Sequence, residues 1–127
     1  MNYIEVKGGL GNQLFQYAFY RYCEKKSVFS VLLYTDFYKY CKFVKGATIR
    51  DFGLDKYNCD FVGIDGHIIC NRKIDERQFK EADFKLDETF YSGYWQRKDF
   101  FEAVRTEILS ELSLKPKYIS EELKNLA

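Results

Sequence analysis

Histidine and proline each occur once in the 127 residues of this chain, as His67 and Pro116. One histidine excludes a metal site built from several imidazoles, and it leaves a Ser-His-Asp or Cys-His catalytic site open only to His67 itself. His67 directly follows Gly66, and we interpret it as a surface or turn residue rather than as a catalytic base. We therefore expect no bound metal, and the sequence identifies no catalytic residue.

The cysteines lack the spacing of a metal or redox motif. None of the four, which are Cys23, Cys41, Cys59 and Cys70, forms a Cys-x-x-Cys pair, and this excludes zinc knuckles and thioredoxin-like redox sites. The first residues, MNYIEV, contain neither a positive region nor an apolar region of a secretory signal, so we expect reduced thiols. Cys23 falls on the apolar face of a predicted helix, and we expect it in the core.

Neither sign of charge is in excess. Lysine and arginine number 20 and aspartate and glutamate 19, which gives a formal net charge of +1. Nonspecific nucleic-acid binding needs clustered positive charge, so this balance argues against it. No apolar segment approaches the ~20 residues of a membrane-spanning helix. We expect a cytoplasmic protein with no nucleic-acid partner and no transmembrane segment.

Apolar and aromatic residues, by contrast, are plentiful. Hydrophobic residues make up 46% of the chain and aromatic residues 19%, which is enough to build the core of one domain. Exposed aromatic rings also suit sugar binding, because the faces of sugars stack on them. We expect most of the rings to fill the core.

The first third of the chain has the pattern of a β–α–β unit. Residues 2–6 alternate as in a short strand, and a glycine-rich loop follows. Helical spacing begins at Gln13, and Lys25 and Lys26 close the helix. Residues 28–34 are almost continuously apolar, as in a buried parallel strand. The pattern predicts an α/β fold, namely a Rossmann-like three-layer domain with a mainly parallel sheet. The apolar face of the helix is predicted to comprise Leu14, Phe15, Ala18, Phe19, Tyr22 and Cys23.

The middle of the chain has weaker patterns. Residues 63–66 are typical of a turn and residues 67–70 of a short strand. Residues 71–88 carry charges of both signs without a block of one sign, which favours a solvated helix or loop. Alternating aromatic residues predict a strand over residues 89–96, in which Gly93 allows a close backbone approach or a bulge.

The C-terminal quarter is expected to be helical. Asp99, with Glu102 three residues later, is the predicted N-cap of a helix that continues to about Leu114. A further helix is predicted to begin at Ser120. We divide the chain into a Rossmann-like domain, residues 1–115, and a linker or the start of a helix, residues 116–127.

The loop between the first strand and the first helix concentrates glycine. Three of the eight glycines fall within four residues, and two side-chain amides follow them: Gly8, Gly9, Gly11, Asn12 and Gln13. Glycines permit positive φ and let backbone N–H groups approach an anion, and the N-terminus of the helix adds further donors. The loop is therefore a candidate cradle for a diphosphate. A tight turn from strand to helix would also account for the glycines, and both explanations stay open.

Known nucleotide-binding motifs match this loop incompletely. Leu14 stands where the third glycine of a Gly-x-Gly-x-x-Gly motif would be, and no Gly-Lys-Ser/Thr of a P-loop follows. Asp36, after the second predicted strand, has the place of a ribose-binding acid, but a single aspartate at the end of a strand is usually a turn residue. The loop is therefore not a P-loop, and it matches only the first half of the dinucleotide-binding motif.

Three stretches resemble one known family. Residues 8–18, GGLGNQLFQYA, closely resemble the N-terminal signature of glycosyltransferase family 11, the bacterial α-1,2-fucosyltransferases. Residues 50–58, RDFGLDKYN, are similar to the Arg-x-Phe-x-Leu segment of that family. Residues 91–101, YSGYWQRKDFF, are similar to its Gly-Tyr-Trp-Gln segment and the helix after it. The three stretches occur in the order of the family and span almost the whole chain.

The resemblance implies an inverting transfer of L-fucose from GDP-fucose to a sugar hydroxyl, in bacterial surface-polysaccharide assembly. It implies no required metal or other cofactor, and its partners are the nucleotide sugar and a glycan acceptor. On this basis we expect the nucleotide sugar to contact Gly8, Gly9, Gly11, Asn12 and Gln13. Tyr94, Trp95 and Gln96 are candidates for the acceptor side, or else belong to an inward-facing aromatic strand.

The family also has a feature that this chain lacks. The resemblance implies a GT-B arrangement of two Rossmann-like halves, in which a His-x-Arg-Arg-Gly-Asp motif helps to hold the diphosphate, and no such motif follows His67. We expect the chain to be the N-terminal half, to transfer no fucose alone, and to self-associate or pair with a missing C-terminal domain through exposed apolar surface. The alternatives are a non-catalytic remnant and a Rossmann-type nucleotide-binding or partner-binding module unrelated to sugar transfer.

Overall fold

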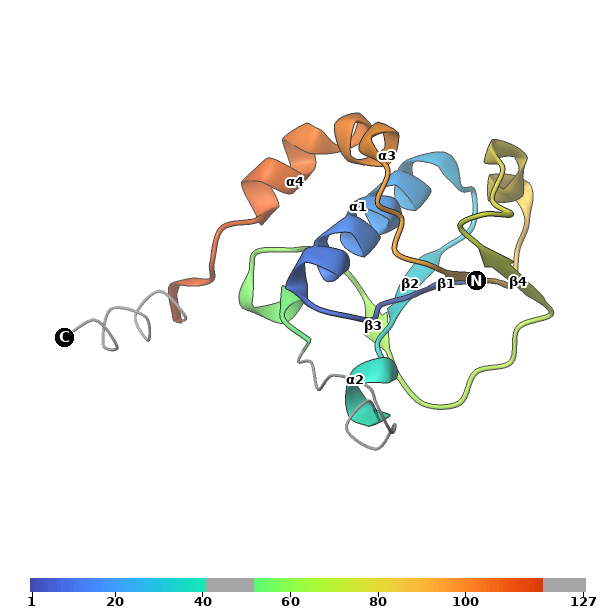
Figure 1. Cartoon of the computed structure of the whole chain (residues 1–127), viewed down its shortest axis with the longest axis horizontal. Helices are drawn as coiled ribbons and strands as arrows, with labels where there is room; N and C mark the ends of the chain where they lie inside the picture. Colours follow the sequence, from blue (N-terminus) through green and yellow to red (C-terminus); the bar gives the residue numbers. More distant parts are fainter. Residues whose placement is uncertain (41–51, 118–127) are drawn as a thin grey trace.

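A computed structural model describes residues 1–40 and 52–117 of the chain (Figure 1). Its centre is a five-stranded sheet with the strand order β3-β2-β1-β5-β4. Every neighbouring pair in this sheet is parallel. The α/β, Rossmann-like fold predicted from the sequence is confirmed. The strands are β1 (Asn2–Glu5), β2 (Val31–Tyr34), β3 (Gly63–Ile64), β4 (Arg72–Asp75) and β5 (Thr89–Ser92).

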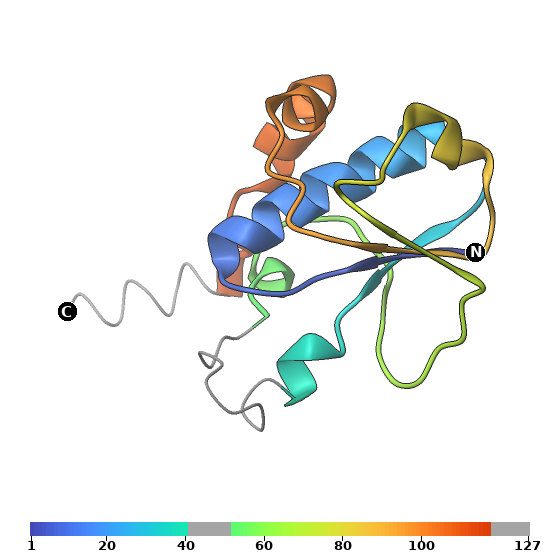
Figure 2. The ribbon, with the colours of Figure 1, turned by 45° about the vertical axis from the view of Figure 1, so that its right-hand side comes forward.

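The longest helix, α1 (Leu10–Lys26), runs across one face of the sheet (Figures 1 and 2). Helix α3 packs against it, and α4 continues on the same side. The short helix α2 and the segment 65–71 lie on the other side of the sheet in both views. The remaining helices are α2 (Phe37–Tyr40), α3 (Lys98–Ala103) and α4 (Arg105–Glu111), with 3₁₀ turns η2 (Leu54–Lys56) and η3 (Glu81–Lys85).

The order of the strands reverses at β1. Strands β2 and β3 follow on one side of it, whereas the segment 65–71 carries the chain to the far edge of the sheet, where β4 lies, and β5 then returns to the place beside β1. The loops that leave the carboxyl ends of β1 and β5 therefore lie next to each other. In open parallel sheets, a ligand binds outside the carboxyl ends of the strands at such a reversal.

An aromatic cluster under α1 forms the centre of the core. Phe19 stacks on Trp95 with ring centroids 3.8 Å apart, and both side chains are fully buried. Phe79, Tyr91 and Phe100 contact Phe19 or Trp95 in edge-on or tilted orientations. These rings occupy the core, as we expected for most of the aromatic residues.

Two strands of the sheet, β3 and β4, differ from the prediction. The strand expected at residues 67–70 is wrong, because the pairing lies at Gly63–Ile64, where a turn was expected. Strand β4 falls in the charged stretch that favoured a helix or loop. Ile74 is its buried residue and its neighbours are exposed, so an edge strand of this kind has no alternation to reveal it.

The predicted helix from Asp99 to about Leu114 is two helices. Val104 separates α3 from α4, and its side chain is fully buried at the break. Asp99 is not the N-cap, because the cap position is Arg97 and Asp99 lies in the first turn, where it pairs with the Arg97 guanidinium at 2.6 Å. The helix predicted from Ser120 lies outside the described residues.

A polar cluster ties α4 to α1. The Glu111 carboxylate accepts hydrogen bonds from the Tyr17 hydroxyl and, at 2.9 Å, from the Arg21 guanidinium. The Tyr17 oxygen also accepts the backbone N–H of Asp60 at 2.9 Å. Burial, together with the hydrogen bond to Glu111, raises the pKa of Tyr17 far above that of a free tyrosine. This tyrosine is therefore a neutral structural link.

The described cysteines Cys23, Cys59 and Cys70 are free thiols, and Cys41 lies outside the described residues. Cys23 is in the core, as predicted, and burial raises its pKa well above the ordinary thiol value. Burial and the nearby charge of Glu111 raise the pKa of Cys59 to about 11. Both thiols are protonated near neutral pH and are therefore poor nucleophiles.

Candidate functional site

The glycine loop turns the chain from β1 into α1. Gly8 has φ +84°, and a Cβ atom there would lie 2.8 Å from the Asn12 side-chain nitrogen and 3.3 Å from the Tyr94 ring. Gly9 is extended and is the N-cap of α1, with no side-chain cap. The turn therefore requires glycine at position 8, for conformation as well as for space.

Gly11 has no such structural requirement. It is the second residue of α1 and is exposed, and a Cβ atom there would have no atom of the described residues within 4 Å. In the interior of a helix, alanine is more favourable than glycine by about 0.8–1 kcal/mol. The turn explains Gly8, whereas nothing in the described residues requires glycine at position 11.

The start of α1 offers donors without acceptors. Within the described residues, no oxygen accepts a hydrogen bond from the backbone N–H of Leu10, Gly11 or Asn12, and the first turn contains no acidic residue. Free N–H groups and the positive end of the helix dipole favour an anion at this position. The 17 residues of α1 make the dipole a long one.

Gln13, expected at the nucleotide sugar, is fully buried. Its side-chain nitrogen donates to the Gly8 carbonyl at 3.1 Å, and its oxygen accepts the Gly53 N–H at 2.8 Å. The buried Gln16 accepts the Lys7 N–H at 3.0 Å and donates to the Gly93 carbonyl at 2.9 Å. These two glutamines hold three loops in place, and Gln13 positions the glycine loop from inside.

The loop after β5 separates the three residues expected on the acceptor side. Trp95 is fully buried against Phe19, so its ring faces the core. Tyr94 is 39% exposed and lies beside Gly8, and the exposed Gln96 donates to the Asn12 side-chain oxygen at 2.6 Å. Tyr94 and Gln96 are therefore the residues of this segment that border the glycine loop and solvent.

Glu76 is a residue of the site that the sequence did not indicate. Its carboxylate accepts the backbone N–H of Trp95 at 3.0 Å and that of Tyr94 at 3.5 Å. Gly93 has φ +156°, and a Cβ atom on it would lie 3.0 Å from the Glu76 Cβ, which is the close approach expected there. Trp95 has φ +56°, a strained value for a large side chain, and Glu76 stabilises this turn. Nothing in the mixed charges of residues 71–88 distinguished Glu76 beforehand.

The described part of the second family-like stretch, residues 52–58, also lies at the start of α1. Leu54 is fully buried. The Gly53 N–H donates to the Gln13 side chain. A Cβ atom on Gly53 would lie 3.2 Å from the Leu10 side chain, so the two residues are close neighbours. Arg50, the first residue of that stretch, lies outside the described residues. The described parts of all three stretches thus meet around the first two turns of α1.

Asp36 and His67 have other roles. The Asp36 carboxylate accepts the Gly66 N–H at 2.9 Å, so it stabilises a turn beyond β2. His67 is exposed in the segment 65–71, on the side of the sheet opposite α1. The structure therefore gives each of them a surface or turn position, as their surroundings in the sequence favoured.

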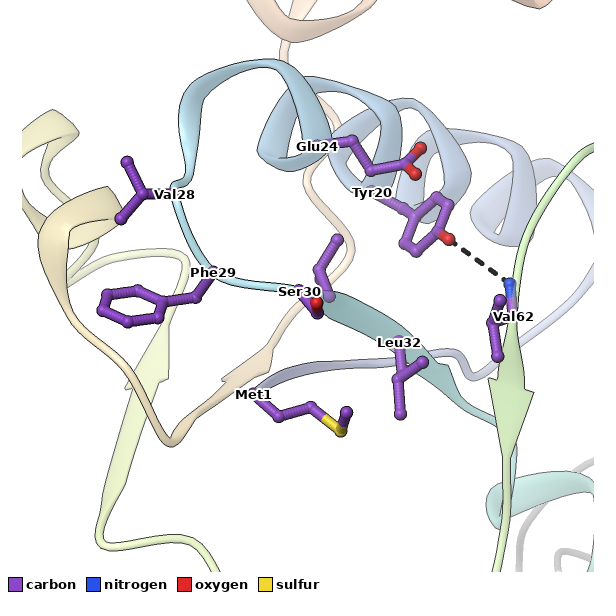
Figure 3. A pocket seen from close by; sticks show the side chains of 9 residues that line it. Met1, Tyr20, Glu24, Val28, Phe29, Ser30, Leu32 and Val62 are labelled. Atoms are coloured by element: carbon purple, nitrogen blue, oxygen red, sulfur yellow. Dashed lines mark hydrogen bonds between the residues drawn. The ribbon is translucent and has the colours of Figure 1, made fainter.

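A pocket of about 470 Å³ lies away from the glycine loop, near the amino ends of β1 and β2 (Figure 3). Of its nine lining residues, one is acidic, Glu24, and none is lysine or arginine. The Tyr20 hydroxyl accepts the Val62 N–H at 3.3 Å on its wall. Such a lining offers little to a diphosphate, and the pocket is at the wrong edge for the binding rule of parallel sheets.

Fold and site together define a Rossmann-like α/β domain with a candidate nucleotide site at the reversal of its strand order. Comparisons of the chain with protein-family models, with curated proteins and with solved structures gave no match. Every helix in the described residues is too short or too polar to cross a bilayer. In the same residues, no three His, Cys, Asp or Glu side chains are placed to hold a metal ion.

Proposed function

We propose that this chain binds GDP-fucose as the N-terminal domain of an inverting α-1,2-fucosyltransferase. The observation that carries the proposal is the meeting of the three family-like stretches around the start of α1. They are far apart in the sequence, yet Gln96 contacts Asn12, Gly93 contacts Gln16, and Gly53 contacts Gln13. Segments that serve one binding task are expected to meet in space, and the contacts among these three stretches support the proposal.

The proposed chemistry follows from where negative charge develops. An acceptor hydroxyl oxygen attacks the anomeric carbon of fucose, the bond from that carbon to the diphosphate breaks, and GDP leaves with its electrons. The proton of the attacking hydroxyl passes to water or to the departing diphosphate. The N–H groups of Leu10, Gly11 and Asn12, with the dipole of α1, would stabilise that departing diphosphate. Gly9 and Gly11 let the backbone approach it, and Asn12 adds a side-chain amide. The acceptor would be held on the side of Tyr94 and Gln96.

Substitution of Gly11 distinguishes a loop that binds GDP from a loop with a purely structural role. We expect Gly11→Ala to raise the free energy of unfolding by up to about 1 kcal/mol, because alanine is the better helix residue and its Cβ meets open space. We expect the same variant to bind GDP at least tenfold more weakly, because the Cβ occupies the space of the diphosphate. Chemical denaturation and calorimetric titration with GDP measure the two quantities.

Gly8→Ala is the matched control. It forces a side chain into φ +84° and against Asn12, so we expect both stability and GDP binding to fall. GDP binding by Gly11→Ala equal to that of the wild type would contradict the proposed site. Wild-type protein that binds NAD or ATP and ignores both GDP and GDP-fucose would instead support a nucleotide-binding module unrelated to sugar transfer.

A further inference from the structure

We infer that a second pocket, bordered by Tyr94 next to the glycine loop, binds one ring of a neutral, hydroxyl-rich sugar. The pocket has a volume of about 210 Å³ and lies outside the carboxyl ends of β1, β5 and β4. That it is the acceptor sugar rests on the proposed function. Its lining residues are Lys7, Asp75, Glu76, Arg77, Ser92, Gly93 and Tyr94.

The parallel sheet builds this pocket. Ser92 and Asp75 are register partners on β5 and β4, and the Ser92 hydroxyl donates to the Glu5 carboxylate at 3.2 Å on β1. Three neighbouring strands thus bring hydroxyl and carboxylate groups to one edge. Lys7 continues the row, since its ammonium group is 3.4 Å from Glu5. The pocket is therefore built on the carboxyl ends of three paired strands.

Its chemistry fits hydroxyl groups better than an anion. Two cations, Lys7 and Arg77, are balanced by two carboxylates, Asp75 and Glu76, so the lining has no net charge. One oxygen of Asp75 accepts the N–H groups of Arg77 and Gln78 at 2.9 and 3.0 Å, which fixes the carboxylate. Donors on Lys7 and Arg77 beside carboxylate acceptors suit sugar hydroxyls, each of which donates and accepts. A diphosphate would meet as much repulsion as attraction there.

Size and neighbourhood point to the same ligand. Pockets for drug-sized ligands begin at about 300 Å³, so about 210 Å³ suits a single ring. The Tyr94 ring lines the pocket, with the Lys7 ammonium 5.2 Å from its centroid and Gly8 beside its edge. A sugar in this pocket would lie next to the donor site, which is where an acceptor hydroxyl is needed.

Titration of the isotope-labelled full chain with methyl β-D-galactopyranoside tests the inference by amide NMR. We expect shifts at the backbone of Lys7, Asp75, Arg77, Ser92 and Gly93, and a separate set at residues 9–12 with GDP. Arg77→Ala and Ser92→Ala should weaken glycoside binding at least fivefold and leave GDP binding unchanged. Arg105→Ala, an exposed arginine on α4, is the matched control and should change neither.

The outcomes separate the two proposals. GDP shifts without any glycoside shifts would overturn the sugar pocket and leave the proposed function standing. Glycoside shifts without GDP shifts would overturn the proposed function and support a sugar-binding pocket that serves no donor. Inorganic phosphate that shifts the pocket amides more strongly than the glycoside would overturn its assignment to a neutral ligand.

Discussion

Trp95→Ala is expected to lower the free energy of unfolding by about 3–5 kcal/mol, the usual cost of truncating a buried aromatic side chain. Trp95 is fully buried and stacks on Phe19 at 3.8 Å, with Phe79, Tyr91 and Phe100 around the pair. Small domains are stable by about 5–15 kcal/mol, so this loss is a large share of the total. Denaturation followed by far-UV circular dichroism measures it in variants that lack the single tryptophan of the chain.

Two further variants test the reason for this loss. Trp95→Phe keeps the stacking and removes the indole N–H, which has no acceptor among the described residues, so its cost should be well below that of Trp95→Ala. Tyr94→Ala changes the exposed neighbour and should stay within about 1 kcal/mol of the wild type. A Trp95→Ala protein as stable as the Tyr94→Ala protein would mean that the indole is outside the core.

The sequence predicted the fold class because its strongest signals are local. The strand, glycine loop, helix and strand of residues 2–34 depend on neighbouring residues, and α1 ends at Lys26 as expected. Helix α1 nevertheless begins at Leu10 rather than Gln13. Leu10 extends the apolar row of Leu14, but glycine at position 11 is unfavourable inside a helix and concealed this first turn. Strand β4 depends on pairing with β5, far along the chain, and its charged residues concealed it.

The sequence predicted which residues form the candidate site, but not which of them are buried and which reach the surface. Glycine, asparagine and glutamine at the start of a helix predict backbone and amide contacts, but burial decides which of them a ligand can reach. Gln13 and Trp95 face inward, whereas Gly11, Asn12, Tyr94 and Gln96 border the surface. Such a division depends on which helix face meets the sheet, and this is fixed by tertiary packing rather than by spacing.

Glu76 and Lys7 could not be found from the sequence for a related reason. Glu76 is one charged residue among several and Lys7 is the last residue before the glycines, and the role of each arises from a partner distant in the chain. Glu76 meets the backbone of the loop after β5, and Lys7 meets the Tyr94 ring. The reversal of strand order creates these encounters, and no local pattern encodes it.

Gln16→Leu is expected to have the second large effect, because Gln16 ties the loops of β1 and β5 together from inside the core. Its oxygen accepts the Lys7 N–H and its nitrogen donates to the Gly93 carbonyl, and leucine of similar size does neither. Each buried group left without a partner costs about 1–3 kcal/mol, so we expect a loss of about 2–5 kcal/mol in the free energy of unfolding.

Gln16→Leu should also loosen both the sugar pocket and the glycine loop. Lys7, which Gln16 holds, lines the sugar pocket, and the next residue, Gly8, begins the glycine loop. We expect weaker binding of GDP and of the glycoside together, measured at a temperature where the variant remains folded. Gln96→Leu is the matched control: Gln96 is exposed, so its loss should change stability by about 0.5 kcal/mol or less. Equal stability of the two leucine variants would show that the loops are held by other contacts, because the buried amide would then contribute no more than a surface one.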